Sequence, residues 1–488
     1  MAGDGAGNRG AGAFEAVIGL EIHVQLATAS KMFCGCELSF GEPPNTRTCA
    51  VCLGLPGSLP VANARAIHFG LMIGLALGSE LAPRSIFHRK NYFYPDQSKN
   101  YQISQYDEPL CRAGSLEEVR IHRVHLEEDA AKLIHIGASG RIHGSDASIV
   151  DFNRAGTPLA EIVTEPDIRS PEQASEWLKL LRSTMRRLGV SDVNMEEGSL
   201  RCDANISLRP AGSGELGVKT ELKNMNSFRF IERGIRAELE RQRKILADGG
   251  QVTQETLHFD PASGALTSLR SKEEAHDYRY FPEPDLLPVA IAEEMIDLAR
   301  EAMPELPAEQ AARLQRELDL SSESAQRLAF ASELGDYFED ALAAAVDPAP
   351  PAQMLANWLT GDLVARLGDG EDPRASRVQP GALAGLVGLV AERRISVGAG
   401  RQVLDRLVAE GGEPQAIVDA EGLAAIDGAE ELAAIVADAV RANADAAERV
   451  REGNAKAIGP IVGHVMRETK GRADGTEVSR LIHEQLGV

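Results

Sequence analysis

The segment from residue 200 to 208 places polar side chains at every second position, with Leu, Cys, Ala and Ile between them. In a β-strand, alternate side chains leave opposite faces, so one face of this segment can pack against a core while the other presents polar groups. Carboxylate and amide oxygens suit a hard divalent cation, and a guanidinium neutralises an anion. The residues of polar parity are Arg201, Asp203, Asn205 and Ser207.

Two further segments, 20–26 and 218–223, show the same alternation. A sheet built from these three strands would carry carboxylate, imidazole and ammonium groups on one face, as a catalytic sheet that holds a metal ion and an anion does. Alternating polar residues also occur where the outer face of a strand is merely solvated, and composition leaves both interpretations open. The polar residues are Glu21, His23 and Gln25 in the first segment and Lys219, Glu221 and Lys223 in the second.

The first four of the six cysteines form a Cys-x-Cys pair and a Cys-x-x-Cys pair, separated by twelve residues. Four thiolates in two close pairs are typical of a closed tetrahedral site for structural zinc. The alternative is four free cysteines in a reducing compartment, whereas a disulfide framework is not expected in so long a chain without a signal peptide. The sequence therefore predicts a structural Zn²⁺ bound by Cys34, Cys36, Cys49 and Cys52.

Seven motifs, in order and spacing over about the first three hundred residues, resemble the B subunit of the heterotrimeric tRNA-dependent amidotransferase. The most specific is MEEGSLRCDANISLRP at 195–210. The others are VIGLEIHVQL (17–26), RKNYFYPDQSKNYQISQYD (89–107), HLEEDAAK (125–132), DFNRAGTPLAEIVTEPDIRSP (151–171), ELKNMNSF (221–228) and DYRYFPEPDLLP (277–288).

The resemblance implies a ligase that uses ATP to phosphorylate the side-chain carboxylate of glutamate misacylated onto tRNA(Gln), or of aspartate on tRNA(Asn). Ammonia then displaces the phosphate and leaves an amide. Phosphoryl transfer depends mainly on positioning and on neutralisation of charge, normally with Mg²⁺. No Gly-x-x-x-x-Gly-Lys-[Ser/Thr] loop and no glutaminase-like cysteine is present. The resemblance therefore implies an amidase partner that supplies ammonia, and a small third subunit.

At the positions that match the family, the resemblance implies Glu21, His23, Glu128 and Glu221 as ligands of Mg²⁺. Mg²⁺ prefers oxygen, so His23 could instead bind a second metal or orient a carboxylate. Glu128 shares its alternation with Val124 and Leu126, so we expect the strand to end there or a bulge to turn Glu128 toward the site. The resemblance further implies Glu128, Asp203, Lys90, Lys219, Lys223 and Arg201 as catalytic residues, and Asn205, Ser207 and Arg154 as nucleotide-binding residues.

The fold class that we predict is α+β, with a mixed or antiparallel sheet in a catalytic cradle, followed by an all-α domain and a small helical tail. Ser170-Pro171-Glu172-Gln173 predicts a helix start, and a second long helix is predicted at Phe228–Ala247. The tail resembles the family's tRNA-binding module but has Pro460 in place of an aromatic residue. The boundaries are a disordered tail at 1–13, the cradle at 14–292, the helical domain at 293–410 and the helical tail at 411–488.

The net charge of −22, from 51 basic and 73 acidic residues, argues against an extended nucleic-acid surface and leaves room only for local basic patches. No apolar run is long enough to span a bilayer and no secretory signal is recognisable, so we expect a cytoplasmic protein. The aromatic runs at 92–94 and 278–281 fit a core or a site wall, and alternatively a surface that stacks bases. Two other functions remain open: a non-catalytic tRNA-binding scaffold, and an ATP-dependent ligase for a small carboxylate.

Overall fold

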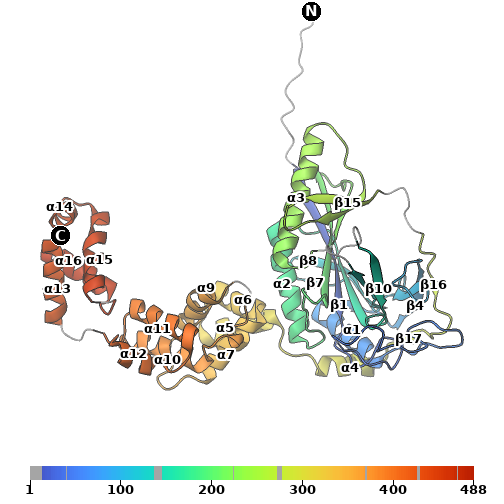
Figure 1. The fold of residues 1–488 in the computed structure, drawn as a ribbon, viewed down its shortest axis with the longest axis horizontal. Coiled ribbons are helices and arrows are strands. Elements are labelled where there is room, and N and C mark those ends of the chain that lie inside the picture. Colours follow the sequence, from blue (N-terminus) through green and yellow to red (C-terminus); the bar gives the residue numbers. More distant parts are fainter. Residues whose placement is uncertain are drawn as a thin grey trace, which may run out of the picture. The chain divides into compact units, whose positions relative to one another are not determined.

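In a computed structural model, the chain forms two compact units, one up to Leu306 and one from Pro307 onward (Figure 1). The structure describes residues 14–39, 41–136, 145–223, 225–271, 277–368, 371–425, 429–469 and 471–488. The tail predicted at residues 1–13 therefore lies outside the described residues. Among the described helices, none is both long enough and apolar enough to cross a membrane.

A ten-stranded mixed sheet forms the centre of the first unit. Its order is β15-β14-β13-β12-β1-β11-β8-β6-β2, with β7 beside β8, and only the β13–β14 pair is parallel. This sheet confirms the α+β prediction. The strands are β1 (Phe14–Gln25), β2 (Glu80–Leu81), β6 (Cys111–Arg112), β7 (Ser115–Leu116), β8 (Val119–Glu128), β11 (Pro158–Thr164), β12 (Leu200–Pro210), β13 (Thr220–Lys223), β14 (Glu255–Phe259) and β15 (Leu266–Ser271).

Helices cover the apolar face of the sheet, as the strand alternation requires. In Figure 1, α2 (Pro171–Arg187) and α3 (Phe228–Ala247) run beside the sheet. The helix α3 packs on β12, and α1 (Ala64–Ala76) packs on β8. Their buried aliphatic side chains share one core with the inward-facing residues of the strands. This packing leaves the opposite, polar parity of the central strands available for a site.

Both predicted helix starts in the first unit are confirmed by their capping bonds. The Ser170 hydroxyl accepts the backbone N–H of Gln173 at 3.1 Å, with Pro171 in the first turn. In a capping box, the Gln173 side chain would accept the backbone N–H of Ser170. Here its side-chain oxygen accepts the N–H of Arg169, one residue earlier in the chain. The Ser227 hydroxyl caps α3 in the same way. Each cap satisfies backbone donors that a helix start otherwise leaves unpaired.

Smaller elements surround the main sheet. A three-stranded sheet joins β16, β4 and β5 in that order, and β9 pairs with β10 in a hairpin. The helix α4 packs on α1, so the first compact unit extends to Leu306, past the expected domain boundary at 292. These elements are β3 (Arg84–Ser85), β4 (Phe87–Asn91), β5 (Tyr101–Gln105), β9 (Lys132–Ile136), β10 (Ala147–Asp151), β16 (Phe281–Pro282), β17 (Val289–Ala290) and α4 (Glu293–Glu301).

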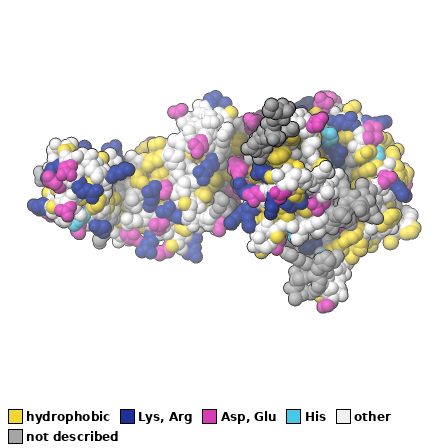
Figure 2. Space-filling model, turned by 90° about the horizontal axis from the view of Figure 1, so that it is seen from above, with side chains coloured by type: hydrophobic (Ala, Val, Ile, Leu, Met, Phe, Trp, Pro, Cys, Tyr) yellow, Lys and Arg dark blue, Asp and Glu magenta, His cyan; other side chains and the backbone are white. Residues whose placement is uncertain are grey.

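The described secondary-structure elements of the second unit are all helices, and the unit contains two hydrophobic cores. One core uses residues between Ala311 and Leu423, and the other uses residues between Leu432 and Leu486. Its helices are α5 (Pro307–Leu318), α6 (Ser322–Phe330), α7 (Ser332–Ala343), α8 (Ala352–Asn357), α9 (Val364–Leu367), α10 (Pro380–Ala391), α11 (Val397–Glu410), α12 (Pro414–Glu421), α13 (Ala429–Ala442), α14 (Ala444–Arg451), α15 (Gly459–Glu468) and α16 (Gly475–Leu486). On the face shown in Figure 2, basic and acidic side chains are interspersed.

Candidate functional site

The strand register places the alternating polar side chains of the central strands on one face of the sheet. In the β1–β12 pair, Glu21 lies opposite Asp203 and His23 lies opposite Arg201. On the other edge of β1, Glu161 of β11 lies opposite His23. Because directly opposed residues point to the same side of a sheet, these side chains form continuous rows across the strands. We call this surface the polar face.

Two histidines and three carboxylates gather on the polar face around Glu161. The His23 Nε2 atom lies 3.5 Å from a Glu161 oxygen, 3.8 Å from Glu21 and 4.0 Å from Glu127. The His125 Nε2 atom lies 3.3 Å from Glu161 and 3.6 Å from Glu127. Glu21, His23 and Glu161 form one group that could hold a metal ion, and His125, Glu127 and Glu161 form another. We call these five residues the Glu161 cluster.

The ionisation of the Glu161 cluster is set by its own opposite charges. Burial raises the pKa of a carboxyl, yet His125 and His23 hold the pKa of Glu161 well below its usual range. Burial would lower the pKa of His125, but Glu161 and Glu127 raise it to about 9. The Nδ1 atom of His125 is buried without a hydrogen-bond partner in the described structure. Closely spaced carboxylate oxygens beside two imidazoles suit a divalent cation, so the donor set fits a metal.

Sequence reasoning missed three members of this cluster. Its motif match favoured Glu128, although His125 and Glu127 alternate with the apolar Val124 and Leu126. Glu161 is the single charged residue in a strand that otherwise reads as buried, Pro-Leu-Ala-Glu-Ile-Val-Thr. A buried carboxylate needs a cation or a metal ion as its partner. A lone glutamate in an apolar strand was therefore the signal that could have identified Glu161 as a site residue.

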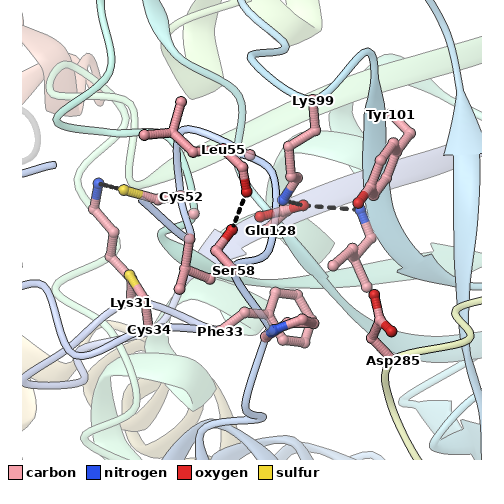
Figure 3. A pocket seen from close by; sticks show the side chains of 15 residues that line it. Lys31, Phe33, Cys34, Cys52, Leu55, Ser58, Lys99, Tyr101, Glu128 and Asp285 are labelled. Carbon is pink, nitrogen blue, oxygen red and sulfur yellow. Dashed lines mark hydrogen bonds and ion pairs between the residues drawn. The ribbon is translucent and has the colours of Figure 1, made fainter. Parts of the chain in front are cut away.

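The structure does not bring Glu128 to the cluster. The β8–β11 register runs without a bulge through Glu127 and Glu128, so the two side chains leave opposite faces. Glu128 instead pairs with the Lys99 ammonium and accepts the backbone N–H of Ile103 at 2.9 Å. Of the two expected alternatives, the strand end is found, because β8 ends at Glu128, and the bulge of this strand pair lies away from it at Val163/Thr164. Figure 3 shows Glu128 with Lys99 in a small pocket.

Glu221 also lies apart from the Glu161 cluster, since β12 separates its strand from β1. The Lys223 ammonium binds Asp203 at 2.6 Å and Glu221 at 2.9 Å, and both carboxylates raise the pKa of Lys223 against the effect of burial. Asn205 lies opposite Glu221 on the polar face, and Ser207 lies opposite Val17. Lys219 precedes β13 and is exposed. Of the four expected magnesium ligands, only Glu21 and His23 come together.

Lys90 stands beside the Glu161 cluster within an aromatic wall. Its ammonium lies 5.1 Å from the Tyr278 ring centre, and the charges of Glu127 and Glu161 raise its pKa against the effect of burial. Tyr280 stacks on Tyr106 with ring centres 4.3 Å apart, and burial raises the pKa of Tyr280 to about 12. Tyr278 and Tyr280 are half-buried, whereas Phe93, Tyr94 and Phe281 of the same two runs are exposed and do not fit a core. A cation here can meet an anionic substrate group.

Arg201 and Arg154 are engaged by a buried carboxylate at the end of the polar face. Asp129 accepts the Gln25 amide at 2.7 Å and the Arg201 guanidinium at 2.8 Å, and Arg154 lies 3.7 Å away. Arg154 also donates to the carbonyl oxygens of Ala130 and Ala131. Burial alone would raise the pKa of Asp129, but the two guanidiniums and the amide hold it below its usual value.

Asp129→Asn is expected to destabilise the first unit by about 2 kcal/mol at pH 7, because it removes a buried charge that binds the Gln25 amide and the half-buried Arg201 guanidinium. A carboxyl with a depressed folded pKa contributes stability that is present above its unfolded value of ~3.9 and lost as the pH falls through the folded value. The gap between wild type and variant should therefore shrink below about pH 4. Urea unfolding at pH 7 and pH 3.5 measures this gap, and a constant gap would contradict the ionic origin.

The four predicted zinc ligands lie together. One sulfur from each of Cys34, Cys36, Cys49 and Cys52 lies within 4.8 Å of the others, and none of the four is in a disulfide. The Cys49 N–H donates to the Cys52 sulfur at 3.2 Å. A hydrogen bond from the Cys34 thiol, with help from Lys31, lowers the pKa of Cys52 to about 4. Four sulfurs clustered in this way fit a tetrahedral metal site.

The chain was also compared with known proteins. The family model described as the GatB/GatE catalytic domain matches residues 16–297, and the GatB domain model matches residues 336–486. A protein of Frankia casuarinae is 50% identical over 97% of this chain and 96% of its own length. Proteins of Thermobifida fusca and an Anaeromyxobacter species are 49% and 47% identical over 97% of this chain, and over 94% and 99% of their own lengths. Each of the three is named as the B subunit of an aspartyl/glutamyl-tRNA(Asn/Gln) amidotransferase.

Proposed function

We infer the function of this chain from the family to which it belongs, the B subunits of the aspartyl/glutamyl-tRNA(Asn/Gln) amidotransferases. Within the tRNA-dependent transamidation, we assign to its polar face the phosphorylation of the misacylated side chain by ATP. The substrate is glutamate on tRNA(Gln), aspartate on tRNA(Asn), or both. The observation that supports this assignment is the Glu161 cluster beside Lys90, since anionic metal ligands next to a cation suit phosphoryl transfer.

The proposed reaction has two steps. A side-chain carboxylate oxygen bonds to the γ-phosphorus of ATP, and ADP leaves. Ammonia then attacks the carbonyl carbon of the acyl phosphate and loses a proton, and phosphate leaves to give the amide. Direct amidation would have to expel oxide from a carboxylate, which is a far poorer leaving group than phosphate. Holding both reactants in line supplies much of the remaining catalysis.

We propose that Glu21, Glu127 and Glu161 bind Mg²⁺, and that His23 and His125 orient these carboxylates. When bound, Mg²⁺ neutralises charge on the phosphates of ATP. Lys90 from one side and Lys223 from the other, assisted by Lys219, would contact phosphate oxygens. Of the remaining polar-face residues, Asn205 would donate a hydrogen bond to the nucleotide, whereas the expected contact of Ser207 does not fit its burial. Arg201 and Arg154 would position Asp129. Asp203 is proposed to hold Lys223 in place, since their 2.6 Å contact supports it.

Three further assignments complete the proposal. The four clustered cysteines bind a structural Zn²⁺. An amidase subunit and a small third subunit assemble with this chain in the cytoplasm, and the amidase supplies ammonia. The helical tail, residues 411–488, grips the aminoacylated tRNA.

Two adjacent glutamates provide a matched test of this proposal. In the reconstituted complex, Glu127→Gln is expected to reduce aminoacyl-tRNA-stimulated ATP cleavage about 100-fold and to raise the Mg²⁺ concentration required, because it removes an anionic ligand. Glu128→Gln removes the same charge from the opposite face of β8 and should leave the Mg²⁺ requirement unchanged. ADP release measured against Mg²⁺ concentration, with Glu-tRNA(Gln) present, separates the two variants.

The same assay separates the competing functions. Loss of ATP cleavage in Glu127→Gln with unchanged tRNA binding would contradict a non-catalytic scaffold. ATP cleavage by the wild-type complex that is indifferent to aminoacyl-tRNA would favour a ligase for a small carboxylate. If Glu128→Gln raised the Mg²⁺ requirement and Glu127→Gln did not, the metal site would have to lie on the Glu128 side of β8.

A further inference from the structure

Lys31 is a fully buried lysine that the proposed chemistry does not use. Its side chain is 1% exposed. Its ammonium donates to the Phe152 carbonyl oxygen at 3.1 Å and lies 3.7 Å from the Cys52 sulfur. Within the described residues, no carboxylate oxygen lies within 4.0 Å of it. Because a buried charge without a compensating partner is costly, an ammonium at this depth calls for an anion.

The cysteine cluster can supply that anion. Four thiolates around one divalent cation carry a net charge of −2. One of the four, Cys52, is buried, so part of this charge is shielded from water. Figure 3 shows Lys31 reaching Cys52 at one side of a pocket of about 110 Å³. Cys34 lines the same side, and Glu128 and Lys99 line the other. Lys31 is therefore the cation placed to offset the metal–thiolate charge.

The backbone around Lys31 is built for this close approach. Gly156 has φ +86°, and a Cβ at this position would lie 3.3 Å from the Lys31 stem and 3.7 Å from the Cys52 Cβ. The Gly156 carbonyl oxygen accepts the Met32 N–H at 2.7 Å. The segment 152–156 is thus held against Lys31 at both ends. The same segment contains Arg154, which binds the Asp129 loop.

We propose that Lys31 is the fixed counter-charge of the four-cysteine metal site and ties that site to the segment 152–156. Lys31 acts as a positioning residue: it strengthens metal binding through its charge and transmits the position of the cysteine loop through the Phe152 carbonyl. This inference rests on the proposed occupancy of the cysteine site by a metal, and is independent of the chemistry proposed for the polar face.

The affinity of the full chain for Zn²⁺ tests the proposal, measured by competition with a chromophoric chelator at pH 7. Lys31→Met keeps the length of the side chain and removes the charge, and it should weaken Zn²⁺ binding about tenfold or more, the usual effect of losing a partner of a metal ligand. Lys31→Gln keeps a donor for Phe152 without the charge and should weaken binding similarly. Lys31→Arg keeps the charge and should retain affinity within a few-fold of wild type.

Lys244→Met is the matched control, because it removes an exposed lysine from α3 and should leave the affinity unchanged. A Zn²⁺ affinity within twofold of wild type in both neutral variants would overturn the role of Lys31. If Lys31→Met fails to fold, the comparison of Lys31→Gln with Lys31→Arg still decides the question. A wild-type chain that binds no Zn²⁺ would instead overturn the proposed metal site itself, whatever the polar face does.

Discussion

Replacing Glu161 by glutamine is expected to reduce aminoacyl-tRNA-stimulated ATP cleavage about 1,000-fold, the largest effect that we predict for a single polar-face residue. Glu161 belongs to both groups of candidate metal ligands and contacts His23 and His125. The substitution removes a shared anionic ligand and the negative charge that both imidazoles face. Steady-state ADP release by the reconstituted complex measures the rate, and binding of Mn²⁺ followed by electron paramagnetic resonance reports the metal directly.

Glu165→Gln is the control for this prediction. Glu165 follows the same strand, but its carboxylate pairs with the half-exposed His122 at 2.9 Å, outside the cluster. This variant should retain wild-type ATP cleavage and Mn²⁺ binding. A Glu161→Gln variant that binds Mn²⁺ as tightly as wild type would show that the metal lies elsewhere on the sheet.

Removing the metal from the cysteine cluster is expected to lower the melting temperature of the first unit by about 10 °C. A ligand at a thousandfold excess over its Kd stabilises the folded state by about 4 kcal/mol, and a domain of this size shifts by about 2–4 °C per kcal/mol. The cluster can exert this effect because its loop is tied into the fold: Asn45 bonds the Val150 carbonyl oxygen, and Asn153 bonds that of Pro43. Calorimetry before and after treatment with a chelator measures the shift.

Two cysteine variants separate loss of the metal from loss of packing. Cys49→Ser should unfold near the temperature of the chelated wild type, and further chelator should not change it. Cys111→Ala disturbs a buried cysteine outside the cluster and should remain sensitive to chelator. If the wild type melted at the same temperature with and without chelator, the cluster would hold no metal that stabilises the fold.

Local patterns were sufficient for much of the fold. The alternation in 20–26 and 201–207 predicted strands with one polar face, because side-chain direction along a strand depends only on parity. Ser170 and Pro171 predicted the start of α2, because a helix cap is a contact between neighbours in sequence. The two cysteine pairs predicted their own cluster, since short spacing already brings each pair together.

The grouping on the polar face followed from long-range pairing instead. Glu161 meets His23 because β11 pairs with β1, and no local feature of either strand specifies that register. Glu221 was expected to bind the same metal ion as Glu21. In the structure, β12 lies between their strands, and Glu221 pairs with Lys223 instead. Which buried residues contact each other therefore depends on the register of all the strands in the sheet.

The sequence by itself determined the family, the α+β class and the residue types that face a site. The tertiary structure alone decided which of two adjacent glutamates joins that site. The motif match favoured Glu128, but the unbroken pairing of β8 with β11 turns Glu127 to the polar face and Glu128 to Lys99. The physical reason is that a strand has a period of two, so a register set by distant segments assigns each neighbour to its side.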